Sequence, residues 1–250
     1  MELGIEGRTA LVMGASGGIG RGIAAALSRE GARVAIASRS RERIEGAAGE
    51  IEGEVTPFVV DTDDLERVGE LPAEVAESAG PVEILVTNTG GPPFGGALDH
   101  SREEWEAAYR SLVLAPRALI EAVLPGMRER RWGRIVNVGS SSMREPIPGL
   151  ALSNIHRMAA VGVFKTLASE VARDGITVNT VATGRFATER LADPNGSLEP
   201  AEERAREEVP AGRLGRPEEF GDLVAFLSSE RAAYLTGTVI PLDGGLLCSA

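Results

Sequence analysis

Short apolar runs rich in β-branched residues alternate along the chain with longer segments in which apolar residues recur at helical spacing. The apolar runs predict strands at residues 8–14, 33–38, 55–60, 82–87, 134–139, 176–182 and 238–242. The segments between them predict helices near residues 19–30, 41–51, 63–78, 101–130, 150–174 and 217–229. Strands that are apolar on both faces and separated by helices indicate a parallel sheet covered on both sides. We therefore expect a doubly wound, Rossmann-like α/β fold.

One segment, residues 185–209, interrupts this alternation. It carries turn signals at Pro194-Asn-Gly196 and at Pro200, and a glutamate-rich stretch near 199–208 that predicts a solvated helical face. Because loops that leave a regular scaffold often carry binding functions, we expect this segment to be a lid over a substrate site. The chain shows no linker, repeat or low-complexity stretch, so residues 1–250 are expected to form a single domain.

Composition and charge limit the classes of partner that the protein can bind. The chain has 250 residues, of which 43% are hydrophobic, and this is enough for one sizeable core. Its formal net charge of −11 argues against a nucleic-acid surface, which needs a basic footprint. No apolar run is long enough to span a bilayer, and the first residues lack a basic and an apolar region. We therefore expect a cytoplasmic protein without nucleic-acid or membrane partners.

Cysteine and histidine are too scarce for a metal centre. Cys248 is the single cysteine, which excludes an internal disulfide and a cysteine-based metal site. His100 and His156 are the only histidines, and we expect both to be surface or packing residues.

A glycine-rich turn follows the first predicted strand. Gly14, Gly18 and Gly20 allow the backbone to turn tightly and to approach a pyrophosphate, whose charge would lie at the N-terminus of the next helix. Such turns also join strands to helices for packing reasons alone, so the interpretation depends on the rest of the chain.

Four further motifs accompany the glycine-rich turn. They are Thr87-Asn-Thr-Gly90, Asn137-Val-Gly-Ser140, Gly212-Arg-Leu-Gly-Arg-Pro-Glu-Glu219 and Gly237-Thr-Val-Ile-Pro-Leu-Asp-Gly-Gly245. With the glycine-rich turn, they make the chain resemble the short-chain dehydrogenase/reductase family over nearly its full length. The C-terminal third resembles the 3-oxoacyl-acyl-carrier-protein reductase branch. This resemblance implies an oxidoreductase that assembles as a homodimer or homotetramer.

The resemblance also implies a set of cofactor contacts. The implied residues are Gly14, Ser16, Gly18, Ile19, Gly20, Asp61, Thr62, Asn88, Gly90, Arg157, Gly184 and Thr188. Asp61 would meet the adenine amino group, and it could also cap the helix that starts near Asp63. Asn88 would line the nicotinamide side or only tie the neighbouring strand by hydrogen bonds.

Arg39 favours NADP(H) over NAD(H) as the cofactor. It stands at the end of the second predicted strand, where an acidic residue would bind an adenosine ribose hydroxyl. Its guanidinium could instead meet a 2′-phosphate, and Arg21 and Arg41 could add to the same charge. The alternative is that Arg39 is an ordinary exposed residue of an arginine-rich chain.

The catalytic residues implied by the resemblance are mostly replaced. The family uses Ser, Tyr, Lys and Asn to hold and protonate the developing alkoxide. Ser140 matches the Ser, whereas the family's interval from Ser140 leads to Ser153 at the Tyr position. Arg157 then stands at the Lys position and Leu112 at the Asn position. Arg157 keeps a positive charge but is a poor proton relay, and a serine hydroxyl is far less acidic than a phenol.

Two other side chains are candidates for a proton donor. His156 has a suitable ordinary pKa, but at helical spacing it points about 60 degrees away from Ser153. We expect His156 to be an exposed or packed residue and Tyr109 to be a packing or interface residue.

Three functions remain open from the sequence. The first is a divergent NADP(H)-dependent oxidoreductase in which Ser140, Ser153, Arg157 or a water stabilises the alkoxide and solvent supplies the proton. Its substrate would be a ketone or a 3-oxoacyl thioester. The second is an inactive NADP(H)-binding sensor or partner subunit. The third is a lyase like the halohydrin dehalogenases, which resemble this chain at Arg157 but keep the Tyr and lose the cofactor loop.

Overall fold

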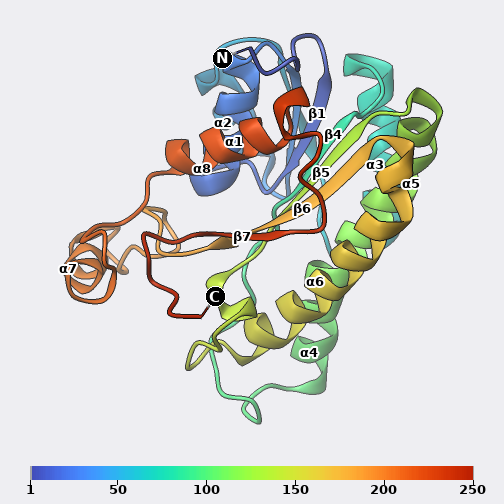
Figure 1. The fold of residues 1–250 in the computed structure, drawn as a ribbon. Helices are drawn as coiled ribbons and strands as arrows, with labels where there is room; N and C mark the ends of the chain where they lie inside the picture. The colour runs from blue at the N-terminus through green and yellow to red at the C-terminus, as the bar shows by residue number, and fades with distance from the viewer. Residues whose placement is uncertain (1, 250) are drawn as a thin grey trace.

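The computed structural model describes residues 2–249 and contains a sheet of seven parallel strands in the order β3-β2-β1-β4-β5-β6-β7 (Figure 1). The strands are β1 Thr9–Met13, β2 Arg33–Ser38, β3 Val55–Val59, β4 Ile84–Thr87, β5 Gly133–Val138, β6 Ile176–Thr183 and β7 Val239–Leu242. Every predicted strand is present, and the largest difference is that β4 begins at Ile84 rather than at residue 82. The predicted doubly wound α/β fold is confirmed.

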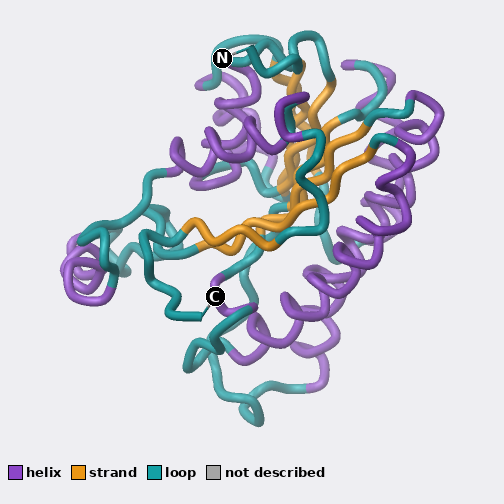
Figure 2. Tube along the Cα trace, viewed as in Figure 1, coloured by secondary structure: helices purple, strands orange, loops and turns teal. Residues whose placement is uncertain are grey.

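Helices cover both faces of this sheet (Figure 2). They are α1 Gly18–Arg29, α2 Arg41–Glu50, α3 Leu65–Ala79, α4 Arg102–Tyr109, α5 Ala115–Arg130, α6 Ala151–Val171, α7 Glu199–Glu208 and α8 Pro217–Leu227. One layer contains α1, α2 and α8, and the other contains α3, α5 and α6 (Figure 1). None of the helices within residues 2–249 combines the length and the apolar character needed to cross a membrane.

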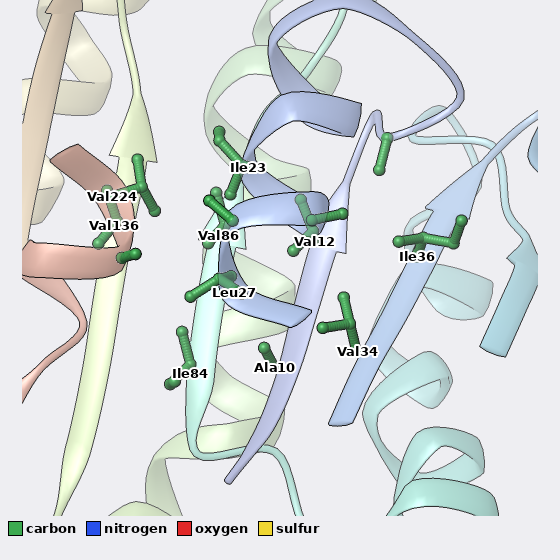
Figure 3. Close-up of a cluster of buried hydrophobic side chains, with 14 of the residues drawn as sticks. Ala10, Val12, Ile23, Leu27, Val34, Ile36, Ile84, Val86, Val136 and Val224 are labelled. Atoms are coloured by element: carbon green, nitrogen blue, oxygen red, sulfur yellow. The ribbon is translucent and has the colours of Figure 1, made fainter. Parts of the chain in front are cut away.

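Two apolar clusters fill the space between the sheet and its helix layers. Alternate side chains of β1 point to opposite faces, as a strand requires. Ala10 and Val12 pack in one cluster with Leu27 of α1, as Figure 3 shows. Leu11 and Met13 pack in the other cluster with α3, α5 and α6. Because β1 is buried on both faces, its residues after Thr9 are apolar without alternation.

The predicted helix over residues 101–130 is divided by a wider turn. α4 ends at Tyr109, residues Arg110–Leu114 form a π-helical turn, and α5 continues from Ala115. Pro116 explains the interruption, because it lacks the N–H that would bond to the carbonyl of Leu112 and its ring crowds that carbonyl. The backbone N–H of Ala115 donates to the carbonyl of Arg110 instead. The turn displaces the carbonyls around Leu112 from regular α-helical bonding.

The strand order creates a crevice at the centre of the sheet. The chain leaves β1 toward β2 on one side, while β4 leads to β5 on the other side. Connections that diverge in this way open a crevice beyond the carboxyl ends of the two strands, where ligands bind in doubly wound sheets. Gly14 follows β1 and Asn88 follows β4, so the two predicted motifs meet at this crevice.

Candidate functional site

The glycine-rich turn between β1 and α1 needs its glycines for close approach. Gly14 has φ +60° and Gly18 has φ +51°, both in the left-handed region. A Cβ on Gly14 would lie 2.5 Å from the carbonyl oxygen of Asn88. Ser16 lies in the same turn and Ile19 at the start of α1, and both are half-buried. The backbone of the turn is therefore packed closely against the end of β4.

Asn88 fastens this turn to the end of β4. Its Nδ2 donates a 3.1 Å hydrogen bond to the carbonyl of Gly14. A Cβ on Gly20 would lie 2.8 Å from that same Nδ2 and 2.8 Å from Cα of Ala15. Asn88 thus has the tying role weighed from the sequence. Gly90, two residues later, faces open space.

The arginines near the end of β2 differ in their partners. Arg21 forms an ion pair with Glu50, and Arg41 pairs with Glu45 at 3.1 Å. These pairs oppose the expectation that both arginines add to the charge of Arg39. Arg39 itself is exposed, and no carboxylate of residues 2–249 lies within 4.0 Å of its guanidinium. Of these three arginines, Arg39 is therefore the one without an ion-pair partner in the described part of the chain.

Asp61 is not a helix cap, which corrects the alternative weighed for it. α3 begins at Leu65, and the side chain of Asp64 caps it by accepting a 3.0 Å bond from the N–H of Arg67. Asp61 lies three residues too early and accepts instead from the N–H of Asp63 at 3.1 Å. Thr62 contacts the π-helical turn through a 3.1 Å hydrogen bond between its Oγ1 and Oγ of Ser111.

Arg157 and Ser140 are brought together at the carboxyl end of β5. Arg157 lies on α6, and its Nη1 donates a 2.9 Å hydrogen bond to the carbonyl of Val138. Ser140 follows two residues after Val138, and its Oγ accepts a 3.2 Å bond from the N–H of Ser142. Burial, and then the positive charge of Arg190, lower the pKa of Arg157 to about 10. Arg157 therefore stays charged at neutral pH.

Ser153 and His156 are both buried side chains of α6. Ser153 is 5% exposed, one turn before Arg157. His156 packs edge-on against Trp105, with ring centroids 5.3 Å apart, and its Nδ1 lies 2.7 Å from the carbonyl of Leu152. His156 is a packed residue, as one of the sequence alternatives proposed.

Residues 185–209, the segment predicted to be a lid, contact both walls of the crevice. A Cβ on Gly18 would lie 3.1 Å from Cγ2 of Thr188, so the lid rests on the glycine-rich turn. Glu189 forms a 2.6 Å ion pair with Arg43 of α2. Arg190 reaches the opposite wall, where it donates to the carbonyls of Gly91 at 3.2 Å and of Pro92 at 3.4 Å.

The beginning and end of the lid are held by other contacts. The N–H of Gly184 donates to the carbonyl of Leu242 at 3.0 Å, and the absence of a Cβ on Gly184 makes room for the backbone of Asp243. Ala205 and Val209 form a small apolar cluster with Leu214 at the far end. Between the lid and the start of α1 lies a cavity of about 480 Å³.

Sequence reasoning missed Arg190 and gave no role to Thr183. The Oγ1 of Thr183, at the end of β6, is buried without a hydrogen-bond partner among the described residues. Arg190 carries no motif, and the only signal for it was an arginine close after Thr188 in the lid. Across residues 2–249 there is no group of three or more His, Cys, Asp or Glu side chains that could hold a metal ion.

Comparison with known proteins assigns the chain to a family. The family model described as Enoyl-(Acyl carrier protein) reductase matches residues 14–247. The 3-oxoacyl-acyl-carrier-protein reductase FabG of Thermotoga maritima is 32% identical, over 97% of this chain and 99% of that protein. The chain belongs to the short-chain dehydrogenase/reductase family.

Solved structures agree with this assignment to the short-chain dehydrogenases/reductases. L-sorbose reductase from Gluconobacter frateurii, complexed with NADPH and L-sorbose, has a TM-score of 0.92 and 32% identity, with 100% of each chain covered. A single-residue variant of actinorhodin polyketide ketoreductase with NADPH has a TM-score of 0.88 and 33% identity, over 96% of this chain and 97% of that one. The homologous region therefore includes the crevice, the lid and the last strand.

Proposed function

We propose that the protein is an NADP(H)-dependent oxidoreductase that reduces a ketone or a 3-oxoacyl thioester without the tyrosine acid usual in its family. The observation that carries this proposal is the glycine-rich turn fastened by Asn88, together with a charged Arg157 that has no carboxylate within 4.0 Å among residues 2–249. The two similar solved reductases are NADPH complexes, which supports the same cofactor for this chain.

The residues of the crevice fit a dinucleotide. At Gly14, Gly18 and Gly20, side chains are excluded by close contacts, so the backbone alone faces the position of a pyrophosphate. The start of α1 offers free N–H groups and the positive end of the helix dipole to that charge. We assign the 2′-phosphate to Arg39 and the nicotinamide side to Asn88, Gly90, Thr188 and Gly184. Asp61 and Thr62 are assigned to the adenine, and Ser16 and Ile19 to the pyrophosphate.

When bound, NADPH supplies a hydride to the carbonyl carbon, and the carbonyl oxygen becomes an alkoxide. Ser140 is proposed to hold that oxygen, because its Oγ already accepts a bond from Ser142 and its own O–H remains free to donate. Arg157 would stabilise the negative charge as it develops and would bind ribose hydroxyls. Since Arg157 keeps its proton at neutral pH, a water molecule would supply the proton that converts the alkoxide into the alcohol. Ser153 is proposed to orient that water.

Turnover of NADPH by the purified protein tests this function. We expect slow but measurable oxidation of NADPH over a panel of ketones and acetoacetyl thioesters. A positioned acid usually contributes about 10²–10⁴-fold, and solvent has to replace it here. Tight NADPH binding without any oxidation would instead support the inactive sensor or partner subunit. Absence of binding would overturn both functions.

Cofactor preference provides a second test of the proposal. We expect Arg39→Ala to weaken NADPH binding by about tenfold or more and to leave NADH binding unchanged, because a charge-assisted contact to the 2′-phosphate is lost. Arg41→Ala is the matched control, since Arg41 is already paired with Glu45. Fluorescence titration with both cofactors measures the effect. Equal affinity of the wild-type protein for NADPH and NADH would refute the assignment of Arg39.

The homodimer or homotetramer expected from the family stays a proposal. Tyr109 of α4 and Ile155 and Met158 of α6 support it, because these large apolar side chains are 45%, 42% and 54% exposed. A cytoplasmic location is likewise a prediction.

A further inference from the structure

Arg190 presents a charged group at the mouth of the crevice. Its guanidinium is held by the carbonyls of Gly91 and Pro92 and lies over the ring of Phe94, 5.3 Å from the ring centroid. Backbone carbonyls and an aromatic ring orient a guanidinium without neutralising its charge. Arg190 uses one N–H on each of two nitrogens in these contacts, so further donors remain free for a ligand.

The loop after β4 is shaped to receive this side chain. A Cβ on Gly91 would collide with the guanidinium of Arg190, so a glycine is needed at this position for Arg190 to lie where it does. The same loop continues to Gly95, which donates a 2.8 Å bond to the carbonyl of Gly149, just before α6. The loop therefore connects the anchor of Arg190 to the helix that carries Ser153 and Arg157.

Arg157 and Arg190 are two positive charges without a neighbouring carboxylate among residues 2–249. In the part of the chain that the structure describes, no carboxylate lies within 4.0 Å of either guanidinium. The two groups lie near enough that the positive charge of Arg190 contributes to lowering the pKa of Arg157. Like charges that lie close together repel each other, and an anion bound beside them relieves this repulsion.

We propose, on the basis of the oxidoreductase function above, that the substrate is an oxo acid whose carboxylate is bound by Arg190. Arg157 faces the reacting oxygen in the proposed function, so Arg190 is the guanidinium left for a permanent anion. An arginine can bind a carboxylate with two parallel N–H···O bonds, which fixes the orientation of the substrate as well as its affinity. Phe94, which is 70% exposed, would cover the apolar part of a small substrate beside this carboxylate.

Calorimetric titration with acetoacetate and with methyl acetoacetate tests this assignment. The two probes share the carbonyl and differ in the negative charge. We expect the wild-type protein to bind acetoacetate at least about tenfold more tightly than the ester, and Arg190→Met to remove this preference, because a charge-assisted hydrogen bond is lost. The titrations are made with and without NADP⁺, so that the preference is measured whether or not the cofactor binds.

Two further variants separate position from overall charge. Gly91→Ala keeps the charge of Arg190 but displaces its guanidinium, and we expect it to reduce the preference for acetoacetate as well. Arg204→Met removes an exposed arginine of α7 and should not change the preference for acetoacetate.

Equal binding of acid and ester by the wild type, or a preference retained in Arg190→Met, would overturn the oxo-acid assignment. Loss of NADP⁺ affinity in Arg190→Met with the acid preference intact would assign Arg190 to the cofactor instead. Failure of NADPH to bind at all would remove the proposed oxidoreductase but would leave the acid preference measured.

Discussion

Replacement of Ser153 by tyrosine together with Arg157 by lysine is expected to raise kcat/KM for carbonyl reduction by about 10²–10⁴-fold, the usual contribution of a positioned general acid. On the proposed correspondence, the new phenol would lie near the oxygen held by Ser140, and the lysine would lower the pKa of that phenol. Ser153 is in the first turn of α6 and Arg157 one turn later, so both new side chains start from the same face of one helix. Steady-state NADPH oxidation with acetoacetyl thioester and acetoacetate measures the gain.

The matched control for this gain is Ser153→Phe/Arg157→Lys. It introduces the same ring without the hydroxyl, so it reproduces any effect of crowding at the buried Ser153 position. The proposed correspondence requires the tyrosine variant to be active and the phenylalanine variant to react no faster than the wild type, because Ser153→Phe also removes the hydroxyl proposed to orient water. An equal rate in both variants, with normal NADPH binding, would show that Ser153 does not face the reacting oxygen.

Replacement of Gly20 by alanine is expected to weaken NADPH binding by about 10- to 100-fold and to lower the melting temperature. The added Cβ would lie 2.8 Å from both Ala15 and Asn88 and would also meet the carbonyl of Gly14. Such overpacking costs about 1–3 kcal/mol and has to move the turn or Asn88. Fluorescence titration of NADPH and a thermal melt measure the two effects.

Gly46→Ala is the control for Gly20→Ala, because both glycines are helical and only their surroundings differ. Gly46 lies on α2 with no atom within 4 Å of an added Cβ. The alanine there should stabilise the protein by up to about 1 kcal/mol through helix propensity and leave cofactor binding unchanged. If Gly20→Ala bound NADPH as well as Gly46→Ala does, the glycine-rich turn would not be the pyrophosphate site.

The sequence predicted the fold well because the relevant signals are local. The apolar run of β1, followed at once by Gly14, marks a strand buried on both faces that ends in a tight turn. The wider turn at residues 110–114 was not predicted, since its cause is one missing N–H at Pro116 inside an otherwise helical pattern. The alternative that Asp61 caps α3 was wrong. Several aspartates stand close together in this segment, and the sequence does not show that Asp64 is the one that caps the helix.

The site was predicted less completely because its contacts join distant segments. The bond from Asn88 to Gly14 was among the alternatives, since both residues end neighbouring central strands. The position of Arg190 depends on how the predicted lid folds back over Gly91 and Pro92, which lie about one hundred residues earlier. The spacing of apolar residues in the sequence does not predict such a contact. The pairing of Arg21 with Glu50 likewise depends on the packing of two helices.

The bond between Asn88 and Gly14 couples the proposed nucleotide site to assembly of the whole sheet. These residues are 74 positions apart in the sequence, with β2 and β3 between them. They meet only after β4 has paired directly with β1. A fragment that ends before β4 would contain every glycine of the turn and still lack the support that shapes it. A bound nucleotide would therefore stabilise the complete native state over partly folded ones, by mass action, and would protect the central strands from unfolding as a single unit.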